Sequence, residues 1–449
     1  MEQFLEKVDE KTTVNQTSSA SASSSQSVSS IDYPDGGLRA WLIVVGSMCC
    51  TFSTFGFVNA WGVFQSYYET SLLQDSSPSN LAWIGSIQYA LVFGPALFSG
   101  RLLDLGYFRG LFTAGTVLVV AATFLVAQCK EYWEFLLCQG FAIGVSGLAH
   151  FIHIKHLFTI HVTRVNKLGC GLCFGPTLGI VGHWFLKRRG LALGLTAVGS
   201  SIGGTIYPIA SRQLIPIVGF PWTMRIMAFI NLAALGVSNL TLAPRLPPKD
   251  LPGGLLNVRV FKSAAFTIWC ILGFVCFLGI YTVLTFIDVT AVKSGVSPDF
   301  SFYLVSMANA SSGIGRLMTG VLADRVGAIT VMAPMSLACA VMTFAWPYAQ
   351  SKESLIAIAI LYGFASSAFV SSFNIPVYAM GEMGDIGRRL GTVFIFTGIG
   401  ALIGPPISGA INRATGGVQA VSYYAGTHLV SCSFLFTFFF ACALLFLYS

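Results

Sequence analysis

The chain has 449 residues, of which 55% are hydrophobic and only 10% are charged, and its net charge is +7. A soluble protein typically carries about 25% charged residues, so this chain has too few to cover a water-exposed surface, and we predict an integral membrane protein. The positive charge is scattered over short loops, which disfavours a nucleic-acid partner, and 11 cysteines are too dilute for a secreted disulfide scaffold.

The chain opens with a polar segment rich in serine, which we predict to be a disordered tail over residues 1–37. The stretch from Thr17 to Ser30 is almost entirely Ser, Ala and Gln, and it cannot bury enough apolar surface to offset the entropy lost on ordering. It also has no apolar stretch of the kind that a signal peptide contains.

Apolar runs long enough to cross a bilayer follow the tail at regular intervals. A crossing helix needs about 20 apolar residues. The runs that qualify begin near Ala40, Leu81, Leu111, Tyr132, Leu191, Thr223, Ala264, Phe300, Val326, Ser354, Gly391 and Ser422. We therefore predict an all-α membrane protein of about twelve transmembrane helices, with an N-terminal six-helix half over 38–243, a cytoplasmic linker over 244–262 and a C-terminal half over 263–449.

The distribution of Lys and Arg predicts the orientation. With the N-terminus inside, the inner loops hold about twice as many of these residues as the outer loops, and cytoplasmic loops collect positive charge. We expect both termini to be cytoplasmic.

Residues 145–167 interrupt the fourth predicted span. The segment holds four of the six histidines, but their spacing without a nearby carboxylate is poor for a metal site. A thirteenth crossing would place the Arg-rich loops of the second half outside. Removing the segment leaves one continuous Gly-rich helix. Val145-Ser146 can be encoded by GTGAGT and Lys167 by AAG, so our hypothesis is a retained intron translated in frame.

One glycine–aspartate pattern occurs at matching places in the two halves. The connection after the second span begins at Gly100 with Asp104 four residues later, and its counterpart begins at Gly320 with Asp324 and Arg325. Glycine permits a tight turn, and an aspartate there can cap a helix end or pair with an arginine. The repeat indicates internal duplication, and we predict a gating and structural role for these residues.

Several longer motifs resemble one family of membrane proteins. They are DGGLRAW at 35–41, GFVNAWGVFQSYY at 56–68, WFLKRRGLALGLTAVGSSIGG at 184–204, NASSGIGRLMTGVLADR at 309–325 and IGPPISGAI at 403–411. Together with the glycine–aspartate loops they resemble the monocarboxylate porter branch of the major facilitator superfamily, in its fungal form. The resemblance implies a two-halved transporter that moves a small organic molecule by alternating access, without a cofactor.

The resemblance also implies a role for Arg316. An arginine within a span is costly and marks a substrate path or a charge partner, and in the related porters the arginine of this motif binds the substrate carboxylate. The alternative is a packing arginine bonded to backbone carbonyls or to Asp324. Those porters carry an aspartate where Ser312 stands and a lysine in the first span, which is absent here, so a larger or less acidic substrate than lactate is favoured.

Four amides within spans complete the predicted substrate-binding set: Asn59, Gln65, Asn309 and Asn374. Polar groups inside a helix bundle usually face its interior. Hydrogen bonding between helices is the alternative for each of them.

The function that the resemblance implies is export of a secondary metabolite or organic acid, with or without a proton, by a monomer in the plasma membrane. Uptake of a monocarboxylate or a riboflavin-like vitamin is the alternative, and a nutrient sensor that transports nothing is a third reading. We expect no enzymatic activity and no metal or cofactor, because no nucleophile–base pair, HExxH or phosphate-binding loop occurs.

Overall fold

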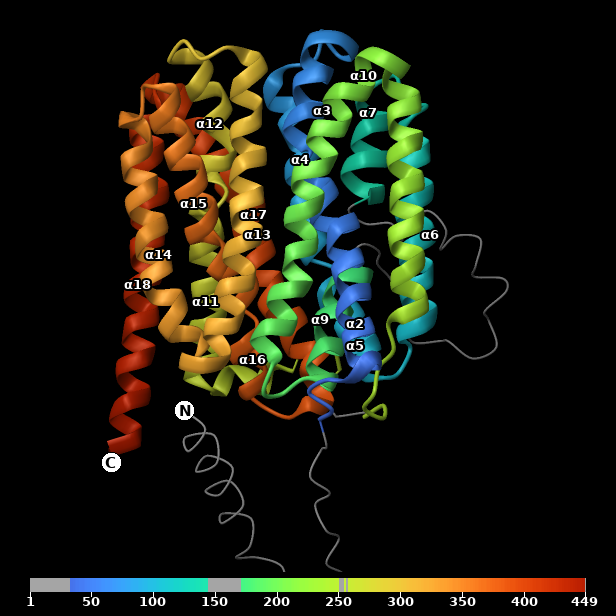
Figure 1. Cartoon of the computed structure of the whole chain (residues 1–449), viewed down its shortest axis with the longest axis vertical. Coiled ribbons are helices and arrows are strands. Elements are labelled where there is room, and N and C mark those ends of the chain that lie inside the picture. Colours follow the sequence, from blue (N-terminus) through green and yellow to red (C-terminus); the bar gives the residue numbers. More distant parts are fainter. Residues whose placement is uncertain (1–32, 144–170, 250–253, 256, 449) are drawn as a thin grey trace, which may run out of the picture.

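A computed structural model of the chain describes residues 33–143, 171–249, 254–255 and 257–448. Within these residues every regular element is a helix, and the helices run side by side along one axis (Figure 1). The proposed insert at 145–167 and most of the predicted N-terminal tail lie outside the described residues.

The first group of helices extends from α2 to α10. Its members are α2 (Gly37–Thr51), π-helical η1 (Phe52–Gly56), α3 (Trp61–Tyr67), η2 (Tyr68–Leu72), α4 (Pro78–Phe93), α5 (Ala96–Asp104), α6 (Phe108–Val126), α7 (Tyr132–Phe135), η3 (Leu136–Ile143), α9 (Gly171–Trp184) and α10 (Arg189–Thr241). The last is two helices joined at Gly219, whose φ of 75° turns the chain back on itself.

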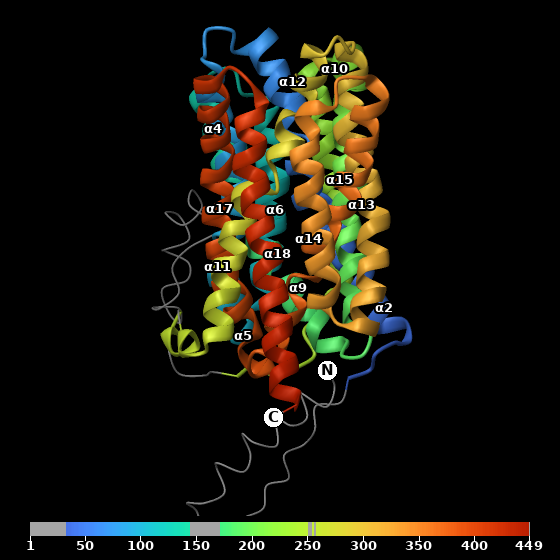
Figure 2. The same cartoon turned by 90° about the vertical axis from the view of Figure 1, so that its left-hand side faces the viewer.

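The second group extends from α11 to α18. After the short η4 (Val258–Lys262) it comprises α11 (Ala264–Gly279), α12 (Thr282–Lys293), α13 (Pro298–Val326), α14 (Ala328–Ala345), η5 (Trp346–Tyr348), α15 (Lys352–Ser372), α16 (Ile375–Ala379), η6 (Met383–Asp385), α17 (Ile386–Thr415) and α18 (Val418–Tyr448). The two groups stand next to each other in Figure 1, and α2 begins at the same end of the bundle where α18 ends (Figures 1 and 2).

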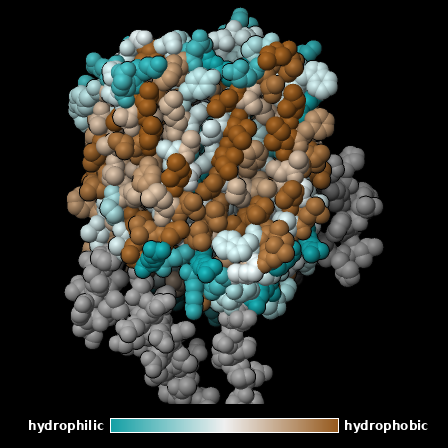
Figure 3. Space-filling view, in the orientation of Figure 1, coloured by the Kyte–Doolittle hydropathy of each residue, from teal (hydrophilic) through white to brown (hydrophobic). Residues whose placement is uncertain are grey.

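Many of these helices can cross a membrane. Among the described residues, seven helical stretches are individually long and apolar enough to span a bilayer. Figure 3 shows a hydrophobic band around the middle of the molecule, with hydrophilic residues gathered at both ends. A bilayer's hydrocarbon core would cover such a band, and helices satisfy their own backbone hydrogen bonds inside it. The predicted all-α multi-spanning fold is confirmed, and the expected starts at Tyr132 and Ala264 coincide with those of α7 and α11.

Glycines allow the two groups to approach closely. A Cβ on Gly320 of α13 would lie 2.5 Å from the carbonyl oxygen of Gly190 on α10, and a Cβ on Gly194 would lie 2.6 Å from that of Arg316. On the other side of the interface, a Cβ on Gly100 of α5 would overlap the backbone of Gly387 on α17. Side chains at these positions would force the helices apart, because backbone already fills the space.

Candidate functional site

A cavity lies between the two groups of helices, and both groups line it. The lining residues are Thr51, Phe55, Asn59, Phe93, Phe174, Leu178, Leu193, Thr196, Ala197, Ser200, Phe277, Ile280, Tyr281, Leu284, Ala308, Asn309, Ser312, Arg316, Gly363, Ser366, Phe369, Val370, Ser371, Phe373, Asn374, Phe394 and Thr397. The centres of water molecules can occupy about 80 Å³ of this cavity, so it has room for a few waters. A large organic molecule therefore needs the cavity to widen.

Interruptions of three helical stretches border this cavity. The chain leaves regular helix at Asn59 before α3, at Ile280 and Tyr281 between α11 and α12, and at Phe373 and Asn374 between α15 and α16. All five residues line the cavity. Irregular backbone at membrane depth is tolerated where it faces a cavity, and its free polar groups can then contact a ligand.

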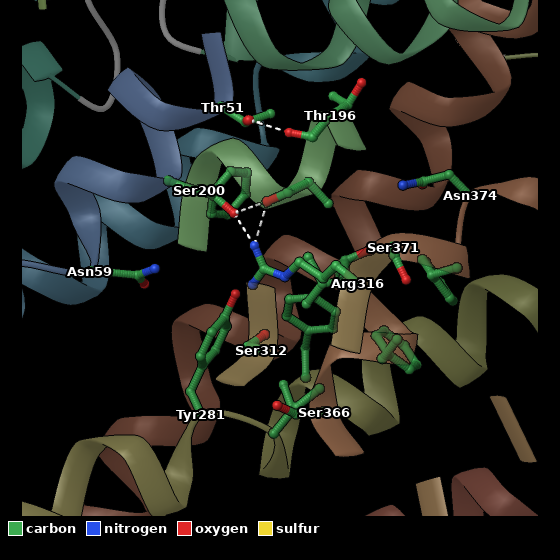
Figure 4. Close-up of a pocket in the computed structure, with 18 of the residues that line it drawn as sticks. Thr51, Asn59, Thr196, Ser200, Tyr281, Ser312, Arg316, Ser366, Ser371 and Asn374 are labelled. Carbon is green, nitrogen blue, oxygen red and sulfur yellow. Dashed lines mark hydrogen bonds between the residues drawn. The ribbon is translucent and has the colours of Figure 1, made fainter. Parts of the chain in front are cut away.

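Arg316 is the only charged residue among the described lining residues. It is buried, with 6% of its surface exposed, and its Nη1 donates to the carbonyl oxygen of Ala197 at 2.6 Å and to the Ser200 hydroxyl. Figure 4 shows the Tyr281 hydroxyl aimed at the same guanidinium. Within the described residues, the buried Nε has no hydrogen-bond partner, so the guanidinium keeps donor capacity for a ligand.

This geometry combines the two expectations for Arg316. It lines the cavity, as a substrate-binding residue must, and it is also bonded to a backbone carbonyl of α10, as a packing arginine would be. Asp324 is not a partner of Arg316, because the Asp324 carboxylate accepts a hydrogen bond at the start of α10.

Three of the four predicted amides line the cavity: Asn59, Asn309 and Asn374. Asn59 Oδ1 accepts a hydrogen bond from the Tyr89 hydroxyl at 2.9 Å. Asn309 Nδ2 donates to the Gly204 carbonyl at 3.2 Å, across to the other group of helices. The buried Oδ1 of Asn374 has no partner among the described residues. The structure thus brings these amides to one cavity with Arg316.

Gln65 is not among the residues that line the cavity. Its Oε1 accepts from Trp61 Nε1 at 2.8 Å, and its Nε2 donates to Glu69 at 2.9 Å. Both partners lie one helical turn away along the same stretch of chain, so Gln65 joins a local polar row.

The sequence did not predict which aromatic residues line the cavity. Phe93, at the end of α4, packs against rings from four other elements, with centroid distances of 5.2 Å to Phe55, 5.3 Å to Phe277, 5.8 Å to Phe394 and 6.2 Å to Phe174. These rings come from both groups of helices. In an apolar span, sequence alone does not separate a phenylalanine that faces a cavity from one that faces lipid.

Two aspartates of the repeated loop motif join the groups at the end where α2 begins. Asp104 accepts hydrogen bonds from the backbone N–H groups of Gly387 at 3.0 Å and Arg388 at 2.9 Å, at the start of α17. Asp324 accepts from those of Gly190 at 2.5 Å and Leu191 at 2.8 Å, at the start of α10. Each carboxylate therefore caps a helix of the opposite group, where the helix dipole also favours negative charge. Gly100 and Gly320 lie at the corresponding helix contacts, and Arg325 is exposed.

The opposite end of the bundle has its own contacts between the groups. Arg212 of α10 pairs with Asp299 of α13 at 2.7 Å. Beside the cavity, the rings of Tyr89 and Tyr281, which belong to different groups, are 5.0 Å apart. Asp299 is almost fully exposed, so its ion pair is weaker than the buried contacts that Asp104 makes at the first end. Both ends of the cavity are therefore bridged in this conformation.

The described residues contain no group of three or more His, Cys, Asp or Glu that could hold a metal ion. Four of the six histidines fall in the segment outside those residues.

Comparison with known proteins gives relatives over most of the chain. A family model described as the Major Facilitator Superfamily matches residues 41–380 and 270–447. The chain is 37% identical over 388 residues to an MFS-type transporter of Gibberella moniliformis, covering 86% of each chain. It is 34% identical to the aspyridones efflux protein apdF of Emericella nidulans, over 88% of this chain and 76% of the relative. It is also 34% identical to the fujikurins efflux protein of Gibberella fujikuroi, over 88% and 80%.

Solved structures share the fold at low sequence identity. The human organic anion transporter MFSD10 superposes with a TM-score of 0.67 at 15% identity, over 89% of this chain and all of that one. FucP in its outward conformation gives 0.61 at 18% identity, over 89% and 99%. At such identities the likeness concerns the fold alone.

Proposed function

Because this chain belongs to the major facilitator superfamily, we propose that it exports a secondary metabolite through the central cavity by alternating access. Relatives at 34% identity that are named as efflux proteins for aspyridones and for fujikurins support export. The fold supports alternating access, because two groups of helices enclose one site and can rock around it.

The substrate class is inferred from a single arginine that lies among aromatic side chains in the cavity. Arg316 is the only charged side chain among the described lining residues, and Phe55, Phe93, Phe277 and Phe394 surround the same space. A guanidinium favours an anionic group, and aromatic walls favour a flat apolar body. We propose an amphipathic organic anion, held by Arg316 and oriented by Asn59, Asn309 and Asn374.

The finer placement in the monocarboxylate porter branch remains part of the proposal. Ser312 lines the cavity one turn before Arg316, where those carriers have an aspartate. With no carboxylate among the described lining residues, the cavity favours export down the metabolite's own gradient, or with a proton bound by the substrate itself. The substrate that we propose is larger than lactate.

The contacts at the two ends act as alternating gates in this proposal. Asp104 and Asp324 hold the cytoplasmic end closed, and the Arg212–Asp299 pair with the Tyr89–Tyr281 contact holds the outer end. Export requires the cytoplasmic end to open first, because the metabolite enters from the cytosol. We place both termini in the cytoplasm of a plasma-membrane monomer, with halves at 38–243 and 263–449 and a linker at 244–262.

The experiment is an untargeted comparison of metabolites inside and outside cells that carry or lack the gene. Export predicts a compound that accumulates inside and falls in the medium on deletion, whereas uptake predicts depletion inside and retention in the medium. A change in neither pool, with the protein present in the membrane, contradicts transport and favours a sensor.

Complementation of the deletion strain then tests the site. Arg316→Gln should abolish export, and Arg316→Lys should restore only part of it, because an ammonium cannot reproduce the fork of a guanidinium. Arg259→Gln is the matched control, since that arginine is exposed on η4, outside the cavity. Full export by Arg316→Gln at normal membrane abundance would refute the substrate-binding role.

A further inference from the structure

Arg189, at the start of α10, is a buried cation without a carboxylate partner. It is 8% exposed, its Nε donates to the carbonyl oxygen of Phe185 at 2.9 Å, and its buried Nη2 has no hydrogen-bond partner among the described residues. None of the ion pairs within those residues includes Arg189. By contrast, Arg389 of α17 is also buried but pairs with Asp385 at 2.8 Å. A buried charge without a counter-charge is costly, so the position of Arg189 calls for an explanation.

The ring of Tyr378, from the other group of helices, lies over this guanidinium. Arg189 Cζ is 4.6 Å from the ring centroid, and an aromatic face attracts a cation. Tyr378 is buried on α16, which Figure 1 labels at the end of the bundle where α2 begins, and its hydroxyl donates to the carbonyl oxygen of Leu178 at 2.6 Å. Leu178 lines the cavity, and a Cβ on Gly182, one turn further along α9, would overlap the Tyr378 ring. Tyr378 thus joins the second group to α9 and α10 of the first group beside the cavity.

Two carboxylates bind the backbone on either side of Arg189. Asp35, from the segment before α2, accepts hydrogen bonds from the N–H groups of the three residues that precede Arg189. Asp324, from the second group, accepts from those of Gly190 and Leu191, which follow it. The start of a helix stabilises negative charge, so this position on α10 already holds anionic groups of the protein itself.

Opening of this end removes some of these contacts and keeps others. Tyr378 and Asp324 both belong to the second group of helices, so both leave α10 when the two groups separate here. The guanidinium of Arg189 is then uncovered, beside two backbone N–H groups that have lost their acceptor. A guanidinium next to free N–H groups at a helix start suits a carboxylate or another oxyanion.

We propose that Arg189 is an entrance site for the anionic substrate, covered by Tyr378 in this conformation and uncovered when the cytoplasmic end opens. The site rests on the export function and the orientation proposed above. It lies on the helix that also holds the cavity arginine: Ala197, whose carbonyl accepts from Arg316, follows Arg189 by eight residues, or about 12 Å along α10. An anion from the cytosol binds Arg189 first and then passes to Arg316, after which Tyr378 returns to its place.

Two small thiol reagents of opposite charge test this site without knowledge of the metabolite. A cysteine replaces Ser200, which lines the cavity, in the full-length chain, and inside-out membrane vesicles present the cytoplasmic face to the reagents. The anionic reagent is 2-sulfonatoethyl methanethiosulfonate, and the cationic one is 2-(trimethylammonium)ethyl methanethiosulfonate. Mass spectrometry of the peptide that contains position 200 gives both labelling rates. The ratio of the anionic to the cationic rate measures the charge preference of the entrance, because the frequency of opening affects both rates equally.

The charge of Arg189 should set this ratio. Arg189→Gln should lower the ratio about threefold to tenfold, and Arg189→Lys should retain most of it because the positive charge remains. Arg259→Gln is the matched control, since that arginine is exposed on η4, outside the cavity. An unchanged ratio for Arg189→Gln overturns the proposal. Asp324→Asn is a second variant that leaves Arg189 in place: its ratio should rise, because a carboxylate no longer competes for the site, and a fall would also overturn the proposal.

Tyr378→Phe tests the cover over the site. The variant loses the hydrogen bond to Leu178 but keeps the ring, so both reagents should label about twofold to tenfold faster, at an unchanged ratio. In right-side-out vesicles both rates should fall, whereas a general loosening of the fold raises them from both faces. Rates equal to those of the parent chain would show that Tyr378 does not cover the entrance. None of these rates requires a transported metabolite, so a failure of the entrance site is distinguishable from a failure of the export function.

Discussion

Arg316 Nη1 on α13 donates to the carbonyl oxygen of Ala197 on α10 at 2.6 Å, so the charged residue of one group of helices is held by the backbone of the other. The Ser200 hydroxyl, on the same helix as Ala197, accepts from the same nitrogen. An anion that binds through Nη1 competes with both acceptors. Substrate binding is thereby coupled to the contact between α10 and α13.

Ser200→Ala should increase the affinity for an anionic substrate. The substitution removes one of the two acceptors with which the anion competes for Nη1. A hydrogen bond to a charged group is worth about 1.5–3 kcal/mol, and the Ala197 carbonyl, which stays bonded to Nη1, offsets part of this gain. We expect KM to fall about threefold to tenfold in transport assays with membrane vesicles. Ser211→Ala is the control, because Ser211 is buried on α10 but does not line the cavity. A rise in KM for Ser200→Ala would indicate that the hydroxyl binds substrate directly.

Gly320→Ala should impair transport by separating α10 from α13. Its Cβ would lie 2.5 Å from the Gly190 carbonyl oxygen and 3.2 Å from the Gly194 Cα, and backbone cannot move aside as a side chain can. Overpacking of this kind typically costs about 1–3 kcal/mol. Gly236→Ala is the matched control on α10, because a Cβ there meets nothing within 4 Å. Thermal unfolding in detergent should show a lower Tm for Gly320→Ala and an unchanged or higher Tm for Gly236→Ala. Equal Tm values would contradict the close packing.

Asp324→Asn should shift the conformational equilibrium towards opening at the end where α2 begins. The amide keeps one acceptor but loses the negative charge that two backbone N–H groups and the start of α10 stabilise. A loss of about 1–2 kcal/mol corresponds to roughly a fivefold to thirtyfold change in the equilibrium. The rate at which a thiol reagent labels a cysteine introduced at Ser200 would measure this shift in the conformational equilibrium.

Asp299→Asn is the comparison for that variant. Its carboxylate also bridges the two groups, but its side chain is 96% exposed, so solvent screens the pair with Arg212. The labelling rate should change by less than about twofold. A larger change in the labelling rate than Asp324→Asn produces would show that the Asp299 contact is the stronger of the two.

Asp385→Asn should destabilise the protein more than any exposed carboxylate variant. Asp385 accepts from Arg389 Nε at 2.8 Å and from Arg388 Nη2 at 3.2 Å, and both arginines are about 1% exposed. Leaving buried arginines without their carboxylate costs about 3–5 kcal/mol. Glu382→Gln serves as control, because that carboxylate forms an exposed pair with Lys249. Fluorescence-detected size exclusion after heating should show an earlier loss of Asp385→Asn, and identical profiles would contradict the argument.

Features that depend on composition along the chain could be predicted from the sequence. A span excludes charge over about 20 residues, so α11 and α17 stand out, and Arg316 is conspicuous because a charge there breaks that rule. The repeated aspartates predicted helix caps. Which helices they cap depends on how the two groups face each other, and local sequence does not encode that arrangement.

The remaining site residues could not be identified because they look ordinary in the sequence. Ser200 is one of several serines in its segment, and Phe93 and Phe394 are two of 37 phenylalanines. Their role follows from the direction of each side chain in the folded bundle. Gln65 is the reverse case: an amide within a span attracts attention in the sequence, but in the structure its hydrogen-bond partners Trp61 and Glu69 lie on the same stretch of chain.

A cavity with one fixed positive charge has an electrical consequence. When an organic anion occupies it, the charges of Arg316 and the ligand cancel, and the loaded carrier reorients as a nearly neutral body. When the cavity is empty, the guanidinium remains, and a full elementary charge moved across the membrane corresponds to about 2.3 kcal/mol per 100 mV. A potential that is negative inside therefore acts on the return of the empty carrier and draws the guanidinium towards the cytosol. The membrane voltage would set how fast the exporter becomes ready for its next substrate.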